Sequence, residues 1–148
     1  MSNYFDTTNS GTTFITYNKD GGLTELQTQH DAAYVNWSSN WRMPSKEQLD
    51  ELTNTQNTTS EWTTLNGVNG RLVTSKLNGN SIFFPVSGYN GSNGFHVGTK
   101  GYYWSRTLYV DGNSSGTAWY LDIGSSDFRS TLTFNREHGS SVRAVRNQ

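Results

Sequence analysis

Residues 101–123, GYYWSRTLYVDGNSSGTAWYLDI, are the most informative stretch of the chain. Two segments rich in aromatic and β-branched residues, GYYWSRT and TAWYLDI, flank a loop of Asp, Gly, Asn and Ser. Segments of this kind separated by turn residues are typical of the two strands of a hairpin. The aromatic rings of the stretch then belong either to a packed core or to a surface that holds a ligand.

The loop of this hairpin also resembles a calcium-binding loop. Asp111, Asn113 and Ser115 stand at loop positions one, three and five, Gly116 at six and Asp122 at twelve. The flanks, however, alternate like strands rather than helices, and position twelve is Asp rather than the bidentate Glu. We therefore interpret the loop as a hairpin turn and keep a calcium site as the alternative, with no other metal site expected.

Length and composition indicate a single domain spanning residues 1–148. Hydrophobic residues make up only 32% of the chain but aromatic residues 14%, so few, large side chains must form the core. Charged residues amount to 16% with a net charge of −1, which argues against disorder and against a nucleic-acid partner. The chain has no Cys, which excludes disulfides and thiolate metal sites.

Two helices are predicted in the first third of the chain. Residues 23–37 place Thr24 and Gln27 at capping-box spacing, ahead of apolar residues three and four positions apart. In residues 42–54, Ser45 is the expected N-cap, Gln48 its capping-box partner, and Leu49 the first buried residue.

Strands dominate the expected structure outside these helices. One is predicted at 12–17, and six more at 71–75, 81–85, 101–107, 117–123, 130–134 and 140–146, with recurrent Asn-Gly turns between them. Two helices followed by hairpins predict an α+β fold. We expect nine apolar residues to be buried together: Leu26, Trp41, Leu49, Leu52, Trp62, Phe83, Trp104, Leu121 and Val142.

Catalytic signals are weak. The three histidines, His30, His96 and His138, have no partner at metal-ligand spacing, and no Gly-x-Ser-x-Gly motif is present. The acidic residues of 46–51 are explained by the dipole of a helix N-terminus. We expect neither an enzyme nor a cofactor. The first residues show no signal peptide, and no apolar run is long enough to insert into a membrane.

Residues from about 22 to 145 resemble the bacterial major-paralogous domain family (FISUMP), a C-type lectin-like group. The resemblance is carried by NWRMPS, NGNSIFFP and SVRAV, in this order, although Ala144 stands where the family usually has Pro and residues 1–21 are atypical. It implies a C-type lectin-like fold, with two helices packed on small antiparallel sheets and long irregular loops. The sugar-binding triplets of animal lectins are missing, so calcium-dependent sugar binding is not implied.

The chain is also similar to the variable proteins of diversity-generating retroelements, in which this fold displays a receptor-binding face. That similarity implies a variable, ligand-binding region at residues 101–145, in which Tyr102, Tyr103 and Trp104 are scaffold. The ligand-binding residues it implies are polar or aromatic: Arg106, Tyr109, Asp111, Tyr120, Asp122, Asp127, Arg129, Asn135 and His138. Tyrosine supplies contact area at low entropic cost and the charged residues supply hydrogen bonds, although a solvated sheet face could have the same composition.

The function expected from these observations is non-enzymatic binding. The chain would be a variable protein or surface adhesin of a bacterium or phage, located extracellularly or on a cell or virion surface, with a protein or glycan receptor as its partner. The alternative is a structural assembly module of a pilus, a phage tail or an oligomer. A hydrolase that acts on surface glycans ranks third.

Overall fold

The computed structural model describes residues 5–6, 13–14, 17, 23–90, 96–110 and 116–146 of the chain. Asp111, Asn113 and Ser115 lie outside the described residues, and so does most of the loop that resembles a calcium site.

The predicted α+β class is wrong, because the described chain is β-rich. Its only helices are the short α1 (Ala32–Asn36) and α2 (Lys46–Thr53), with one 3₁₀ turn, η1 (Thr28–His30), before them. Eight strands form three antiparallel sheets, and a further short pair joins β1 (Phe5–Asp6) to β2 (Thr13–Phe14). The expected α+β class, with two helices packed on small antiparallel sheets, is therefore replaced by a β-rich class.

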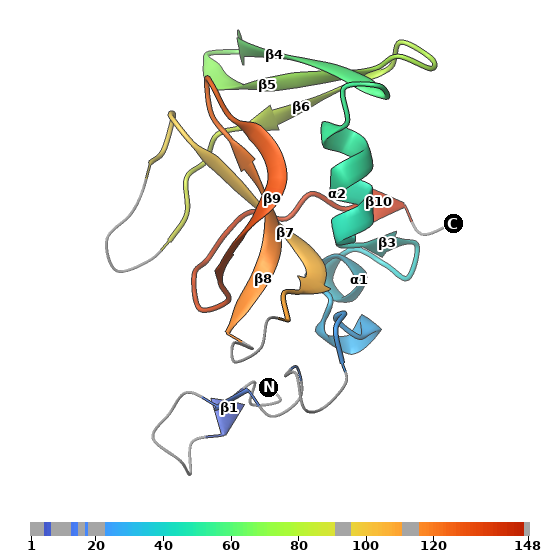
Figure 1. Ribbon diagram of the computed structural model, residues 1–148, viewed down its shortest axis with the longest axis vertical. Helices are drawn as coiled ribbons and strands as arrows, with labels where there is room; N and C mark the ends of the chain where they lie inside the picture. The colour runs from blue at the N-terminus through green and yellow to red at the C-terminus, as the bar shows by residue number, and fades with distance from the viewer. Residues whose placement is uncertain are drawn as a thin grey trace.

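Two three-stranded antiparallel sheets form most of the molecule (Figure 1). One contains β4 (Thr58–Leu65), β5 (Val68–Ser75) and β6 (Ser81–Pro85). The other contains β7 (Gly101–Leu108), β8 (Thr117–Ile123) and β9 (Phe128–Asn135). A third, two-stranded sheet pairs β3 (Trp41–Arg42) with β10 (Val145–Arg146), which brings the end of the described chain beside its first third.

The first predicted helix is wrong over its first half, because this segment lies extended beside the end of β7. The Leu26 N–H donates to the Arg106 carbonyl at 2.9 Å, and the Leu108 N–H donates to the Thr24 carbonyl at 2.7 Å. The helix begins only after Asp31, whose carboxylate accepts hydrogen bonds from the N–H groups of Ala33 and Tyr34. The backbone groups that the helix would have used are thus satisfied by a strand.

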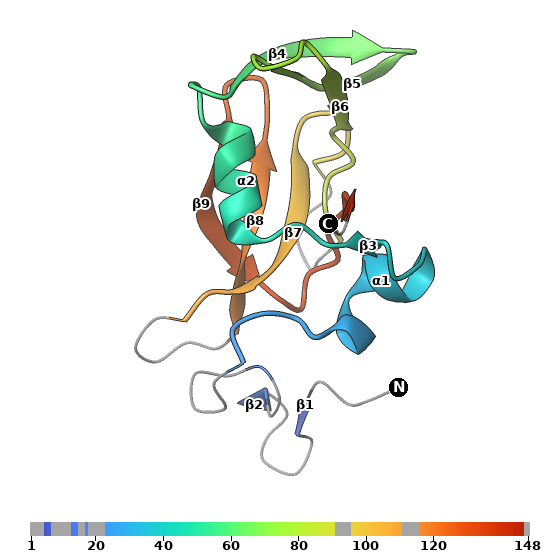
Figure 2. The ribbon, with the colours of Figure 1, turned by 90° about the vertical axis from the view of Figure 1, so that its right-hand side faces the viewer.

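The second predicted helix is confirmed as α2, including its capping box. The Ser45 hydroxyl accepts from the Gln48 N–H, and the Gln48 side chain accepts from the Ser45 N–H. Both bonds satisfy donors that a helix N-terminus otherwise leaves unpaired. Figure 2 shows α2 lying along one face of the sheet formed by β7, β8 and β9.

Strand β4 was not predicted, whereas the strands expected from 71 to 134 are present. The stretch TTSEWTTL is rich in β-branched residues, but it followed directly on a helix and contains few apolar residues. A two-residue turn joins β4 to β5, with Asn66 at φ 49° and Gly67 at φ 80°. Positive φ at both residues is the type I′ geometry that Asn-Gly favours.

The core lies between α2 and the two larger sheets. Its buried members are Leu49, Val73, Phe84, Val86, Tyr103, Leu121 and Ile123. Of the nine residues expected there, Leu49 and Leu121 are core, and Leu52 and Trp62 pack against it. Trp41 is 39% exposed, so its predicted burial is wrong: it lies in a two-residue strand at the surface. No helix in the described part of the chain is long and apolar enough to cross a membrane.

Candidate functional site

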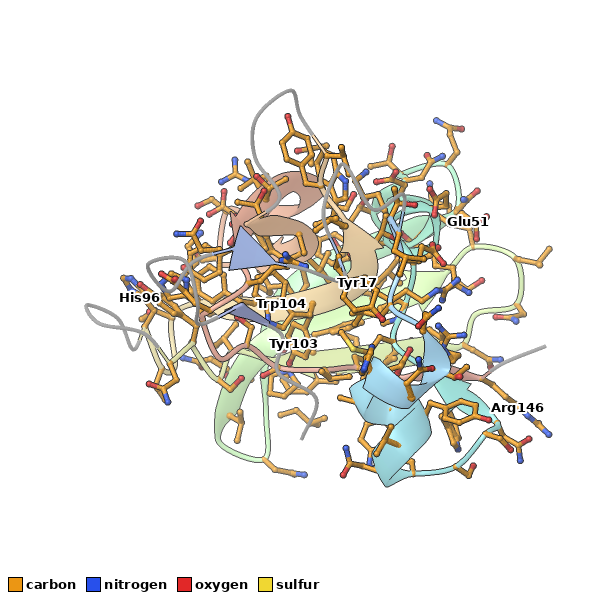
Figure 3. All side chains as sticks on the ribbon, turned by 90° about the horizontal axis from the view of Figure 1, so that it is seen from below. Tyr17, Glu51, His96, Tyr103, Trp104 and Arg146 are labelled. Carbon is orange, nitrogen blue, oxygen red and sulfur yellow. The ribbon has the colours of Figure 1, made fainter. Side chains whose placement is uncertain are left out.

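The β7–β8–β9 sheet has two unlike faces. Because side chains alternate along a strand, Tyr103, Leu121 and Ile123 point toward α2 and join the core. Their neighbours Tyr102, Trp104 and Tyr120 point to the other side, which no helix of the described residues covers. Figure 3 labels one residue of each face, Tyr103 and Trp104. We call the second side the aromatic face; its aromatic and charged strand residues are Tyr102, Trp104, Tyr120, Asp122, Arg129 and Phe134, and Ala118 and Leu132 lie on the same side.

Aromatic rings contact one another across all three strands of this face. The Tyr102 ring stacks on Phe134 with centroids 5.7 Å apart, and lies 5.6 Å from Tyr120. Trp104 contacts Phe134 at 6.0 Å and Tyr120 edge-on at 6.3 Å. Ring pairs at such separations stabilise each other beyond the area they bury. Tyr120 is buried, but the other three rings remain partly exposed.

Two residues from loops extend the aromatic face. The His138 ring stacks on Phe134 with centroids 4.3 Å apart. Tyr89, from the segment after β6, contacts Tyr102 and Phe134 edge-on, each at 5.1 Å, and His138 at 5.4 Å. A Tyr and a His are therefore added to the sheet residues at one edge of the face.

Charged side chains occupy the end of the face near the start of β9. Asp122 is only 2% exposed and accepts from Arg129 Nη2 at 3.0 Å and from Lys100 Nζ at 3.4 Å. Asp127 is paired with the same two cations, at 2.5 Å from Lys100 Nζ and 3.4 Å from Arg129 Nη2. Two carboxylates and two cations thus form one balanced network. The Arg129 side chain is its most accessible member, at 48% exposure.

The network shifts the pKa values of its members. The hydrogen bond from Lys100 lowers the pKa of the Asp127 carboxyl, and the charges of Lys100 and Arg129 lower it further. Burial lowers the pKa of Lys100, but its hydrogen bonds and ion pairs with Asp127 and Asp122 outweigh burial, so that this pKa is raised. Lys100 and Asp127 are therefore charged at neutral pH, and Asp127 is a poor general base.

Two tyrosines of the aromatic face, Tyr102 and Tyr120, have raised pKa values. Burial raises the pKa of Tyr120 to about 12, with a further contribution from the negative charge of Asp122. Burial and Asp122 also raise the pKa of Tyr102. Both phenols remain neutral at physiological pH and can donate as well as accept hydrogen bonds.

The predicted site residues divide between this face and other places. Tyr120, Asp122, Asp127, Arg129 and His138 lie together on or beside it. Asn135 is exposed at the end of β9, where its carbonyl accepts from the His138 N–H at 3.1 Å. Asp111 lies outside the described residues.

The other two predicted residues, Arg106 and Tyr109, do not belong to this group. The Arg106 guanidinium is a clamp between segments: it donates to Glu25 at 3.0 Å and to the Met43 carbonyl at 2.9 Å. Tyr109 packs edge-on against Trp119 at 4.9 Å. Trp119 lies beneath the Lys46 ammonium, on the side of the sheet that α2 covers.

Sequence reasoning missed Lys100, Tyr89 and Phe134 as members of the site, and assigned Tyr102 and Trp104 to the scaffold. The alternation of Tyr102 and Trp104 with the buried Tyr103 was the available signal for the aromatic face. No comparable signal exists for Tyr89 and Lys100, which reach the face from segments outside the strands.

The described residues contain no group of three His, Cys, Asp or Glu side chains that could hold a metal ion. What the face offers chemically is ring surface together with hydrogen-bond donors and acceptors of both charges. Comparison of the chain with protein-family models, curated proteins and solved structures found no match.

Proposed function

We propose that this chain is a non-enzymatic binding domain that recognises a receptor protein through the aromatic face. The observation that carries the proposal is the cluster of partly exposed Tyr102, Trp104 and Phe134 rings beside the half-exposed Arg129. Tyr, Trp and Arg are the residues in which the binding energy of protein interfaces is concentrated. The resemblance to the variable proteins of diversity-generating retroelements, which rests on the sequence alone, implies the same function.

The balanced charges of the face favour a protein partner. Lys100 and Arg129 neutralise Asp122 and Asp127, so the network offers no net field that would attract a polyanion. Networks of this kind fix the orientation of a partner and exclude wrong partners more than they add affinity. A cell-surface or virion-surface location would expose the face to such a receptor.

The test is to apply the purified protein to an array of purified bacterial surface proteins and, in parallel, to an array of defined glycans. We expect a specific signal on the protein array that Arg129→Glu removes. The matched control is Arg146→Glu, which makes the same charge change at an exposed residue of β10, away from the labelled aromatic residues in Figure 3. Binding that both variants retain would contradict the proposal, and a signal on the glycan array alone would replace the receptor protein with a sugar.

A second candidate function, assembly into a larger structure, is favoured by one observation. Strand β4 pairs with β5 only, within the described residues, and Leu65 and Val68 beside it are 49% and 47% exposed. A free strand edge of this kind can pair with another chain. Size-exclusion chromatography with light scattering tests it: we expect Thr64→Pro to abolish any oligomer that forms through β4, because the N–H of Thr64, opposite Asn69, points away from β5.

A further inference from the structure

A cavity of about 410 Å³ lies at the end of the β7–β8–β9 sheet opposite the charged network. Its walls are mostly apolar and come from segments far apart in the sequence: Tyr17, Leu26, Met43, Trp104, Leu108 and Ala118. Figure 3 views the molecule from this end and labels Tyr17 and Trp104, which lie near each other. This volume and this lining are typical of sites for small molecules.

A bulge in β7 produces the space. Trp104 is paired with Tyr120 and Leu108 with Ala118, so that three residues of β7 lie opposite a single residue of β8. The Ser105 hydroxyl stabilises this detour by donating to the Trp119 carbonyl at 2.7 Å. Bulges bend a strand away from its partner and often lie next to binding sites. The cavity is thus built into the strand register.

Hydrogen bonds hold the wall opposite the sheet. Tyr17 is 2% exposed, and its hydroxyl accepts from the Gln27 N–H at 3.0 Å and lies 2.6 Å from His30 Nδ1. The Arg136 guanidinium donates to the Tyr17 carbonyl at 2.9 Å, which ties the same residue to the segment after β9. Both sides of the cavity are therefore fixed before a ligand enters, which lowers the entropic cost of binding.

The charges around the cavity cancel. Arg106 forms an ion pair with Glu25. The other two charged residues of the lining, Arg136 and the exposed Glu137, are adjacent in the sequence and have opposite charges. A charged ligand would be attracted by the side chains of one sign and repelled by those of the other, so it would gain little net electrostatic energy. It would also lose its hydration on entry, which is costly for a charged group. An uncharged ligand loses little hydration and gains contact with the apolar wall.

We propose that this cavity binds a small, uncharged, mainly apolar molecule with a ring system. The cavity adjoins the receptor-binding face, with which it shares Trp104, but it lies at the opposite end of the sheet from Arg129. Glu137 is the exposed member of the lining, and Leu26, Trp104, Arg106 and Arg136 are partly exposed, so the cavity opens to solvent between them. The aromatic walls of Tyr17 and Trp104 suit a planar ring by stacking or edge contact.

The test uses two fluorescent probes with the same ring system. N-phenyl-1-naphthylamine is neutral, whereas 1-anilinonaphthalene-8-sulfonate carries a sulfonate. We expect the neutral probe to bind one to one and at least tenfold more tightly than the sulfonate. Leu26→Trp and Ala118→Leu fill the cavity from opposite walls, and each should weaken binding of the neutral probe at least tenfold.

Leu77→Trp is the matched control, because it adds the same ring at a residue that is 92% exposed. Circular dichroism and thermal melting establish that each variant is folded, and two filling variants keep the test decisive if one of them is not. Arg129→Glu should leave binding of the neutral probe unchanged, which separates this site from the receptor-binding face. Absence of binding, tighter binding of the sulfonate, or unchanged binding in both filling variants would overturn the proposal.

Discussion

The two faces of the β7–β8–β9 sheet use the same three strands for different purposes. On the side of α2, Leu121 and Ile123 are fully buried and pack with Leu49. On the other side, Tyr102 and Phe134 contact mainly other rings and stay partly exposed. A strand that alternates between the two sides can therefore stabilise the fold with one set of residues while the other set remains available for recognition.

The largest loss of stability should come from a substitution on the buried face of the sheet. Leu121 is 0% exposed, and replacing it with Ala leaves a cavity between the sheet and α2. We expect Leu121→Ala to lower the free energy of unfolding by about 3–4 kcal/mol, measured by urea denaturation. Leu77→Ala, the same change at 92% exposure, should lower it by less than about 0.5 kcal/mol. Equal losses in the two variants would show that Leu121 does not belong to a packed core.

Tyr103 and Tyr120 allow the two faces to be compared by pH, because one lies on each. Burial raises the pKa of both to about 12, from 10.0 for an exposed tyrosine. The folded state thus retains these protons longer than the unfolded state does. Their contribution to stability is complete below pH 10 and is lost as the pH rises from 10 to 12.

We expect each tyrosine to account for about 2–3 kcal/mol of this alkaline loss, since one pKa unit corresponds to about 1.4 kcal/mol. The measurement is urea denaturation at pH 9.5 and pH 12. Tyr103→Phe and Tyr120→Phe should each reduce the loss by that amount. If Tyr120→Phe left the loss unchanged while Tyr103→Phe reduced it, the phenol of Tyr120 would be in contact with water and the aromatic face more open than its ring contacts indicate.

The elements that could be predicted from the sequence are those with local causes. The capping box of α2 and the strands between residues 71 and 134 depend on neighbouring residues, and both are confirmed. The helix expected at 23–37 is shorter in the structure because the first part of this segment forms backbone hydrogen bonds with the end of β7. The local sequence pattern contains no information about this distant partner. The α+β class was wrong for the same reason, together with the unpredicted β4.

Some of the residues that were predicted to share one surface lie together in the structure, and others do not. Asp122, Asp127 and Arg129 were expected to lie together, and they form one ion network. Arg106 has the same chemical character, but its guanidinium is bound to Glu25 and to the Met43 carbonyl. Both partners come from the first third of the chain, far from Arg106 in the sequence, so the sequence could not separate Arg106 from the others.

A smaller loss of stability is expected when a charge is removed where the aromatic face meets the charged network. Asp122 is buried and accepts from both Lys100 and Arg129, whereas Asp127 can still hold both cations if Asp122 loses its charge. We expect Asp122→Asn to lower the free energy of unfolding by about 1.5 kcal/mol. Urea denaturation measures it, with Glu51→Gln, the same carboxylate-to-amide change at an exposed residue of α2, as the control. A loss as large as that of Leu121→Ala would mean that the network, rather than the apolar core, holds this sheet in place.

The smallest effect on stability should come from Arg129→Gln. This side chain is half exposed and Asp122 keeps Lys100 as a partner, so the midpoint of thermal unfolding should not change measurably. The positive charge of Arg129, however, lowers the pKa of Tyr120. Its removal should therefore raise the pKa of that phenol further, which a tyrosinate titration of the variant followed by absorbance at alkaline pH detects as a later final step. Arg146→Gln, at an exposed residue of β10, should leave the titration as it is. An unchanged titration in Arg129→Gln would show that its guanidinium does not lie beside the rings, and would remove the cation from the surface on which receptor binding was proposed.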